Sequence, residues 1–64
     1  MKIPVEFKDP ETKEKKVIEV EVHHTLLAKG KEIYRSSIFT HPFEAKRIYV
    51  EFDPETKKVE IKEV

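Results

Sequence analysis

The stretch VEFKDPETKEKKVIEVEV, residues 5–22, decides the fold of this chain because it has the pattern of a complete β-hairpin. Apolar and charged residues alternate on both sides of Asp9-Pro10, and this period of two puts one face of a strand on a core and the other in water. The Asp9 carboxylate can accept backbone N–H groups of a turn, and Pro10 fixes φ where a type I turn needs it. We predict strands over residues 2–8 and 18–22.

Near the other end the same turn returns in VEFDPETKKVEI, residues 50–61. Ile48, Val50 and Phe52 are predicted to face inward on one strand, and Val59 and Ile61 on the next. Four strands then share one continuous apolar face, and such a sheet needs a cover. Pro4 cannot donate to a ladder, which favours an edge position for the first strand or an orientation away from its neighbour.

The cover is predicted over residues 26–38, where the apolar period changes to that of a helix. Thr25 can cap its start and Arg35 suits its last turn, although Gly30 costs a helix interior about 1 kcal/mol. The expected fold is α+β in a single domain, residues 1–64: a ββαββ unit with a four-stranded, largely antiparallel sheet and one helix packed on one face. The helical stripe consists of Leu26, Leu27, Ile33, Tyr34 and Ile38.

An all-β alternative extends the second strand through His23 to Leu27 and turns at Lys29-Gly30. A third strand then runs from residue 32 to residue 39, and a short helix follows near residues 42–46. The product is a five-stranded small barrel of the oligonucleotide-binding kind. A strand over residues 32–39 has no clean apolar face, and we therefore favour ββαββ.

Composition narrows the classes of function. The 64 residues contain no cysteine, which excludes disulfides, thiolate-bound metals and thiol catalysis. No apolar run approaches the ~18 residues of a membrane span, and no segment has the pattern of a signal peptide. We expect a soluble protein that expresses in the cytoplasm, does not bind membranes and is a monomer rather than a dimer.

The repeated turn, the strict alternation, the Lys/Glu filler, the single glycine and the absence of Cys and Trp resemble de novo designed ββαββ miniproteins. The resemblance covers residues 1–22 and 47–64, and it implies an artificial, thermostable scaffold without catalytic activity. Residues 23–46 depart from it, most clearly at His23-His24 and in the run from Ser36 to Phe43. Any binding function is therefore expected in residues 23–47.

Charge is balanced overall, with 13 basic and 13 acidic residues, but residues 23–47 carry five Lys or Arg against two acids. One hypothesis is a nucleic-acid surface on this segment, with Tyr34, Phe39 or Phe43 stacking on bases. The simpler interpretation is a solvated helix face, and we do not expect nucleic acid as the main partner. The basic residues concerned are Lys29, Lys31, Arg35, Lys46 and Arg47.

A second hypothesis is a protein partner that binds Phe39, His41 and Phe43, because the helical stripe does not bury these side chains. The competing interpretation is that the two phenylalanines fold back as a lid over the core, whose area a chain of this size needs.

Metal and catalytic sites are not expected. His23 and His24 would converge with His41 on a metal only if the chain turned at residues 23–24. Ser36 or Ser37 with His41 lacks an orienting acid and oxyanion donors, so we predict no catalytic residues and no cofactor.

Overall fold

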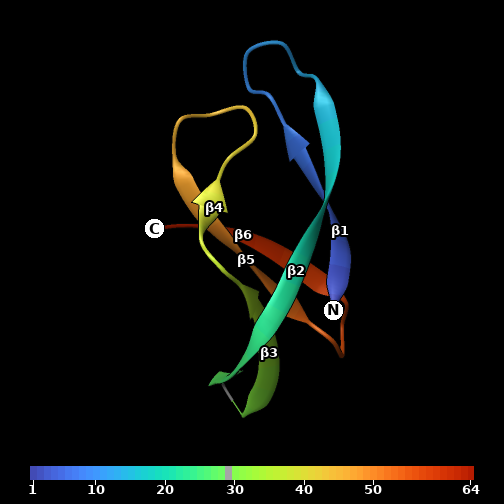
Figure 1. Ribbon diagram of the computed structural model, residues 1–64. Helices are drawn as coiled ribbons and strands as arrows, with labels where there is room; N and C mark the ends of the chain where they lie inside the picture. The colour runs from blue at the N-terminus through green and yellow to red at the C-terminus, as the bar shows by residue number, and fades with distance from the viewer. Residues whose placement is uncertain (29) are drawn as a thin grey trace.

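The computed structural model describes residues 1–28 and 30–64, and these residues form strands and connecting loops only. All strand pairs are antiparallel, in the order β1-β2-β3-β5-β4, with β6 on the other edge of β5 (Figure 1). Since β3 and β4 both pair with one edge of β5, they are two parts of one interrupted strand. The strands are β1 (Lys2–Lys8), β2 (Lys15–Ala28), β3 (Lys31–Ser36), β4 (Phe39–Thr40), β5 (Arg47–Asp53) and β6 (Lys58–Glu63).

The predicted ββαββ fold, and with it the α+β class, is wrong. The described part of residues 26–38 lies in β2, β3 and the connection to β4, and not in a helix. Neighbouring apolar residues point to opposite faces of a hairpin here: Leu26 pairs with Ile33 on one face, and Thr25 pairs with Tyr34 on the other. Because apolar residues lie on both faces of this hairpin, their spacing in the sequence matches the spacing expected of one helix face.

The alternative was right about the path of the strands and wrong about the barrel. β2 does continue past His23, and β3 returns after Gly30, whose φ of +75° is one that glycine adopts readily. However, the sheet stays open, with β1 and β6 as its two edges. Residues 42–46, where that alternative placed a short helix, form an irregular loop.

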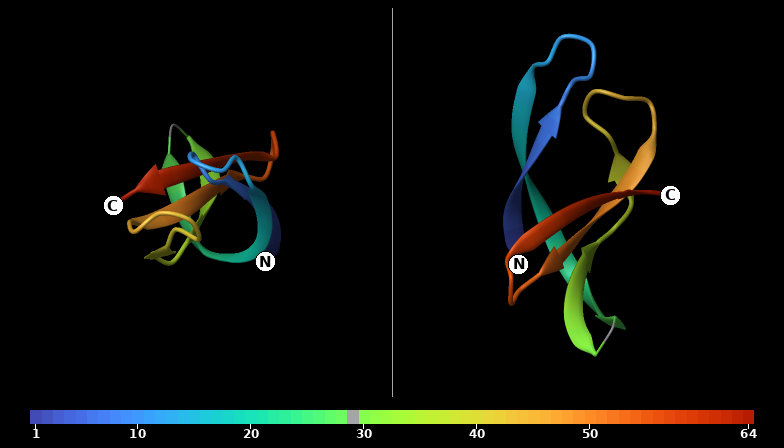
Figure 2. Two further views of the ribbon diagram at one scale, coloured as in Figure 1. Left: turned by 90° about the horizontal axis from the view of Figure 1, so that it is seen from above. Right: turned by 180° about the vertical axis from the view of Figure 1, so that it is seen from behind.

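The core is covered by the curvature of β2 and not by the predicted helix. Residues 15–21 of β2 pair with β1, and residues from Val22 onward pair with β3. In the second part, His23 is an extra residue between Val22 and His24 and forms a β-bulge; bulges bend a strand and increase its twist. The strand therefore curves and carries β1 across from β5 (Figure 2).

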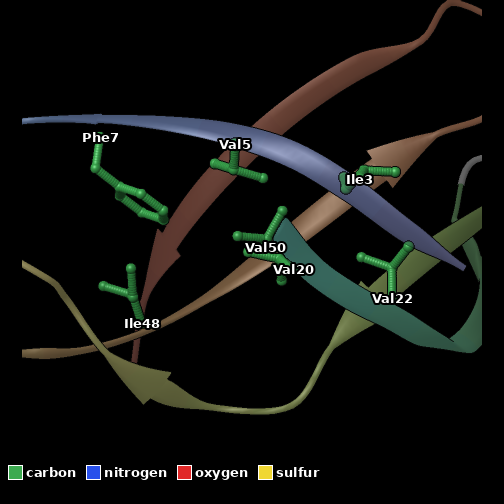
Figure 3. Close-up of a cluster of buried hydrophobic side chains, with 7 residues drawn as sticks. All are labelled: Ile3, Val5, Phe7, Val20, Val22, Ile48 and Val50. Atoms are coloured by element: carbon green, nitrogen blue, oxygen red, sulfur yellow. The ribbon is translucent and has the colours of Figure 1, made fainter. Parts of the chain in front are cut away.

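The core forms where β1, β2 and β5 face one another (Figure 3). Its largest fully buried side chains are Phe7 from β1, Val22 from β2, and Ile48 and Val50 from β5. Tyr34, Phe39, Phe43 and Phe52 pack around it while keeping part of their surface in solvent. The buried apolar residues are Ile3, Val5, Phe7, Val20, Val22, Ile48 and Val50.

A second irregularity separates β3 from β4. Arg35 pairs with Glu51 and Phe39 with Ile48, so three residues, 36–38, stand opposite two, 49 and 50. The hydroxyl of the buried Ser36 fills the gap in the ladder: its Oγ accepts the N–H of Val50 at 2.9 Å and donates to the Ser37 carbonyl at 3.0 Å. The Ser36-Ser37 pair is thus the point where this strand changes register.

The two Asp-Pro-Glu-Thr-Lys turns have the predicted form and use the same geometry. In each, the Asp carboxylate accepts a backbone N–H two residues on, at 2.9 Å from Glu11 to Asp9 and from Glu55 to Asp53. The lysine that ends each turn is left-handed, with φ of 64° at Lys13 and 61° at Lys57. For a residue other than glycine such a conformation costs on the order of 1 kcal/mol.

Replacing Lys57 with glycine should therefore stabilise the protein, by about 0.5 kcal/mol once the extra flexibility of glycine in the unfolded chain is subtracted. Lys57→Val should destabilise it, because a β-branched side chain tolerates positive φ poorly. Thermal melts of both variants test the prediction, and the same pair at Lys13 serves as an internal repeat. Equal melting temperatures for the glycine and valine variants would contradict it.

Candidate functional site

β2 and β3 separate beyond their last pair, Val22 with Ser36, and the chain continues from Ser36 to β4 (Figure 1). A cleft lies between β2 and this continuing chain. We call it the β2–β4 cleft; it has a volume of about 360 Å³ and is lined by residues 18–21 and 23 of β2 and by residues 36–39. Ile18 and Phe39 supply partly buried apolar surface, and Ile38 is 42% exposed. Its β2 side carries Glu19 and Glu21, and Glu21 is paired with the N-terminal ammonium group at 3.3 Å.

Strand edges flank this cleft. Val22 exchanges backbone hydrogen bonds with Met1, so the alternation of an antiparallel ladder turns the N–H and C=O groups of Glu19 away from β1 and toward the cleft. On the other side, the N–H of His41 donates to the Lys46 carbonyl, and Thr40 by the same alternation directs its backbone groups away from β5. Neither Glu19 nor Thr40 has a further strand partner among the described residues.

His23, the bulged residue of β2, lines the cleft. At the bulge the rings of His23 and His24 lie close together, with centroids 4.2 Å apart, although both residues belong to the continuous strand β2. His23 Nε2 is 3.1 Å from Ser37 Oγ, a hydrogen bond that ties β2 to the connection between β3 and β4. Across residues 1–28 and 30–64, no three His, Cys, Asp or Glu side chains gather as metal ligands would.

The aromatic residues proposed to bind a protein partner pack against the core. Phe39 meets Phe7 edge-on with ring centroids 6.0 Å apart, and Phe43 is half-buried. His41 is buried, lies 5.2 Å from the Phe7 ring and accepts the N–H groups of Phe43 and Glu44 at Nδ1. Of the three, Phe39 reaches the β2–β4 cleft.

The basic residues do not form a continuous basic surface: Lys31, Arg35 and Arg47 share the outer face of β3 and β5, but Glu51 and Asp53 lie among them. Lys31 lies on β3 and pairs with Asp53 at 3.5 Å, and the guanidinium of Arg35 stacks 4.6 Å from the Tyr49 ring centroid. Lys46 pairs with Glu44 and Glu63 at the opposite end of β5. Arg47 is exposed on β5 next to Lys46, and Lys29 lies outside the described residues.

A larger hollow, about 500 Å³, lies on the outer face of β3, β5 and β6. Its three lysines are paired with its three acids at 3.5–3.8 Å, so it presents no net charge to a ligand. The β2–β4 cleft, which combines apolar surface with open strand edges, is therefore the better candidate site.

The turn aspartates give the protein a defined acid sensitivity. The backbone N–H of Glu55 lowers the pKa of Asp53 below its ordinary 3.8, with a further contribution from Lys31, and the N–H of Glu11 does the same for Asp9. A carboxylate whose folded-state pKa is lowered contributes stability above its unfolded pKa and loses it as pH falls through the folded value. Both turns should therefore weaken below about pH 4.

We expect Asp53→Asn to lower stability at neutral pH and to flatten the loss of stability below about pH 4. Asp9→Asn should do the same to a smaller extent, because Asp9 lacks the partner that Lys31 provides for Asp53. Urea unfolding midpoints at neutral and acid pH test this. An acid profile of Asp53→Asn that matches the parent protein would contradict it.

Comparisons with family models, with curated proteins and with solved structures find no match to this chain. No helix that could cross a membrane occurs in the described part of the chain. Two residues of the candidate site were not singled out from the sequence. Ile38 was assigned to the helical stripe and Glu19 to a solvated strand face, and only the two bulges bring them to one cleft.

Proposed function

We propose that this chain is a non-catalytic scaffold that serves as a small binding module, and that it takes an extended segment of a protein partner into the β2–β4 cleft. The observation that carries the proposal is a pair of strand edges beside an apolar-lined cleft: one at Glu19, which lines the cleft, and one at Thr40, next to the lining residue Phe39. An added strand would hydrogen-bond to such an edge, and side-chain pockets would select its sequence.

The charge of the cleft defines the partner further. Glu19 favours a basic segment, whereas Glu21 is already paired with the N-terminal ammonium group at 3.3 Å. Ile38 with Ile18 favours apolar residues at alternate positions of the segment. A nucleic acid is a poorer candidate, because the negative rim would repel phosphates and because Lys31 and Lys46 are already paired with acids.

The test is a titration of ¹⁵N-labelled protein with a synthetic peptide of alternating lysine and valine, followed by amide chemical shifts. We expect the largest shifts at Glu19, Ile38 and Thr40. Ile38→Asp should weaken binding at least ~10-fold, since it puts a charge on the apolar wall. Leu27→Asp is the matched control, because Leu27 is 78% exposed on β2 away from the cleft.

Reversing the charge of Glu19 provides a second test of the proposed binding. Glu19→Lys should lose the lysine peptide and gain a peptide of alternating glutamate and valine. The absence of shifts with either peptide at about 1 mM, a concentration at which even weak strand addition is visible, would refute the binding module and leave an inert scaffold.

A further inference from the structure

The two outer edges of the sheet differ in their ability to accept another strand. On β1, the odd-numbered residues bond to β2, so the even-numbered ones direct their backbone groups to the free edge. Pro4 is one of these and has no N–H to offer, which blunts this edge in its middle.

No such device protects β6. The N–H of Val64 donates to the Arg47 carbonyl, so the even-numbered residues of β6 bond to β5, and Val59, Ile61 and Glu63 direct their N–H and C=O groups outward. All six residues of β6 are exposed. Val59 and Ile61 lie on the face of Phe52 and Val50, as predicted, but they are not buried there and remain 37% and 43% exposed.

From this edge we propose that the chain binds a second copy of itself by antiparallel pairing of β6 with β6, centred on Ile61. Charge selects the register. With Ile61 opposite Ile61, Glu60 of each copy lies directly opposite Lys62 of the other on the outer face. A shift by two residues in either direction places Glu60 opposite Glu60 or Lys62 opposite Lys62, and like charges opposite each other are destabilising.

This pairing would give favourable contacts on both faces of β6. On the outer face, Glu60 and Lys62 lie 3.5 Å apart within one copy, and the partner would extend this alternation of charge. On the other face, two copies of Ile61 would cover each other. Glu60 and Lys62 of β6 are therefore complementary when Ile61 lies opposite Ile61.

A charge-swap cycle tests the register. Sedimentation equilibrium of the parent chain should show a mass rising toward twice that of one chain between about 10 μM and 1 mM, as befits a small interface. Glu60→Lys and Lys62→Glu should each weaken association at least ~10-fold, because each puts like charges opposite each other twice. The double variant, Glu60→Lys with Lys62→Glu, should recover it.

Val17→Lys is the control, because Val17 is 64% exposed on β2, away from β6, and its loss should leave association unchanged. Ile61→Lys should also give a monomer, and it does so without changing Glu60 or Lys62. Thermal melts check that each variant is folded. A parent chain that stays monomeric at about 1 mM, or a double variant as weak as the single ones, would overturn the proposal. Because β6 lies outside the β2–β4 cleft, Ile38→Asp should not affect association.

Discussion

Phe7→Ala should unfold most of the protein at room temperature. Removing a buried phenylalanine side chain costs about 3–5 kcal/mol, and a core of this size rarely supplies more than that in total. Phe7 is 1% exposed and touches both Phe39 and the buried His41, so the cavity would open between β1 and the β4–β5 hairpin. Far-UV circular dichroism and urea unfolding measure the loss.

The variant Phe7→Leu distinguishes destabilisation by a cavity from destabilisation by any substitution of Phe7. It fills most of the volume and should leave the protein folded with a smaller loss of stability. Val17→Ala, at an exposed site on β2, should change stability by less than about 0.5 kcal/mol. A folded Phe7→Ala variant with nearly unchanged stability would show that Phe7 does not hold β1 against the β4–β5 hairpin.

Ser36→Ala should cost about 1–3 kcal/mol, because it leaves the buried N–H of Val50 without its acceptor. In a domain of this size each kcal/mol lowers the melting temperature by about 4–8 °C. The loss has a local signature as well: the Val50 amide should exchange with solvent much faster than in the parent chain.

Ser37→Ala is the matched control for this prediction. Ser37 is the adjacent residue and is exposed, and its hydroxyl bonds to His23 at the surface. We expect a loss well under half of that caused by Ser36→Ala. If the two alanine variants were equally stable, the Ser36 hydroxyl would not be replacing the ladder bond between β3 and β5.

The hairpins were predictable because local chemistry specifies them. Asp9-Pro10 and Asp53-Pro54 set the turns, and period-two alternation sets the faces, so β1, β5 and β6 lie where the sequence places them. Pro4 also indicated its position correctly: β1 is an edge strand and Pro4 faces away from β2. The left-handed lysines were not predicted, since nothing in a Lys-Lys or Lys-Glu pair indicates positive φ.

Residues 23–40 were not predictable from periodicity, because each bulge shifts the alternation by one residue. Val20 and Val22 face the core before the bulge at His23, and Thr25 shares the core side after it. Two such shifts in one segment produce apolar spacings that match a helix. The β2–β4 cleft depends on these same shifts, so its residues could not be brought together from the sequence alone.

Amide hydrogen exchange at Glu19 and Thr40 is the sharpest test of the proposed binding site, because two open strand edges define that site. In the free protein we expect these amides to exchange fast while those of Val20 and Ile48 are protected, and we expect the lysine-valine peptide to slow exchange at Glu19 and Thr40. Protection of Glu19 and Thr40 equal to that of Val20 in the free protein would contradict it.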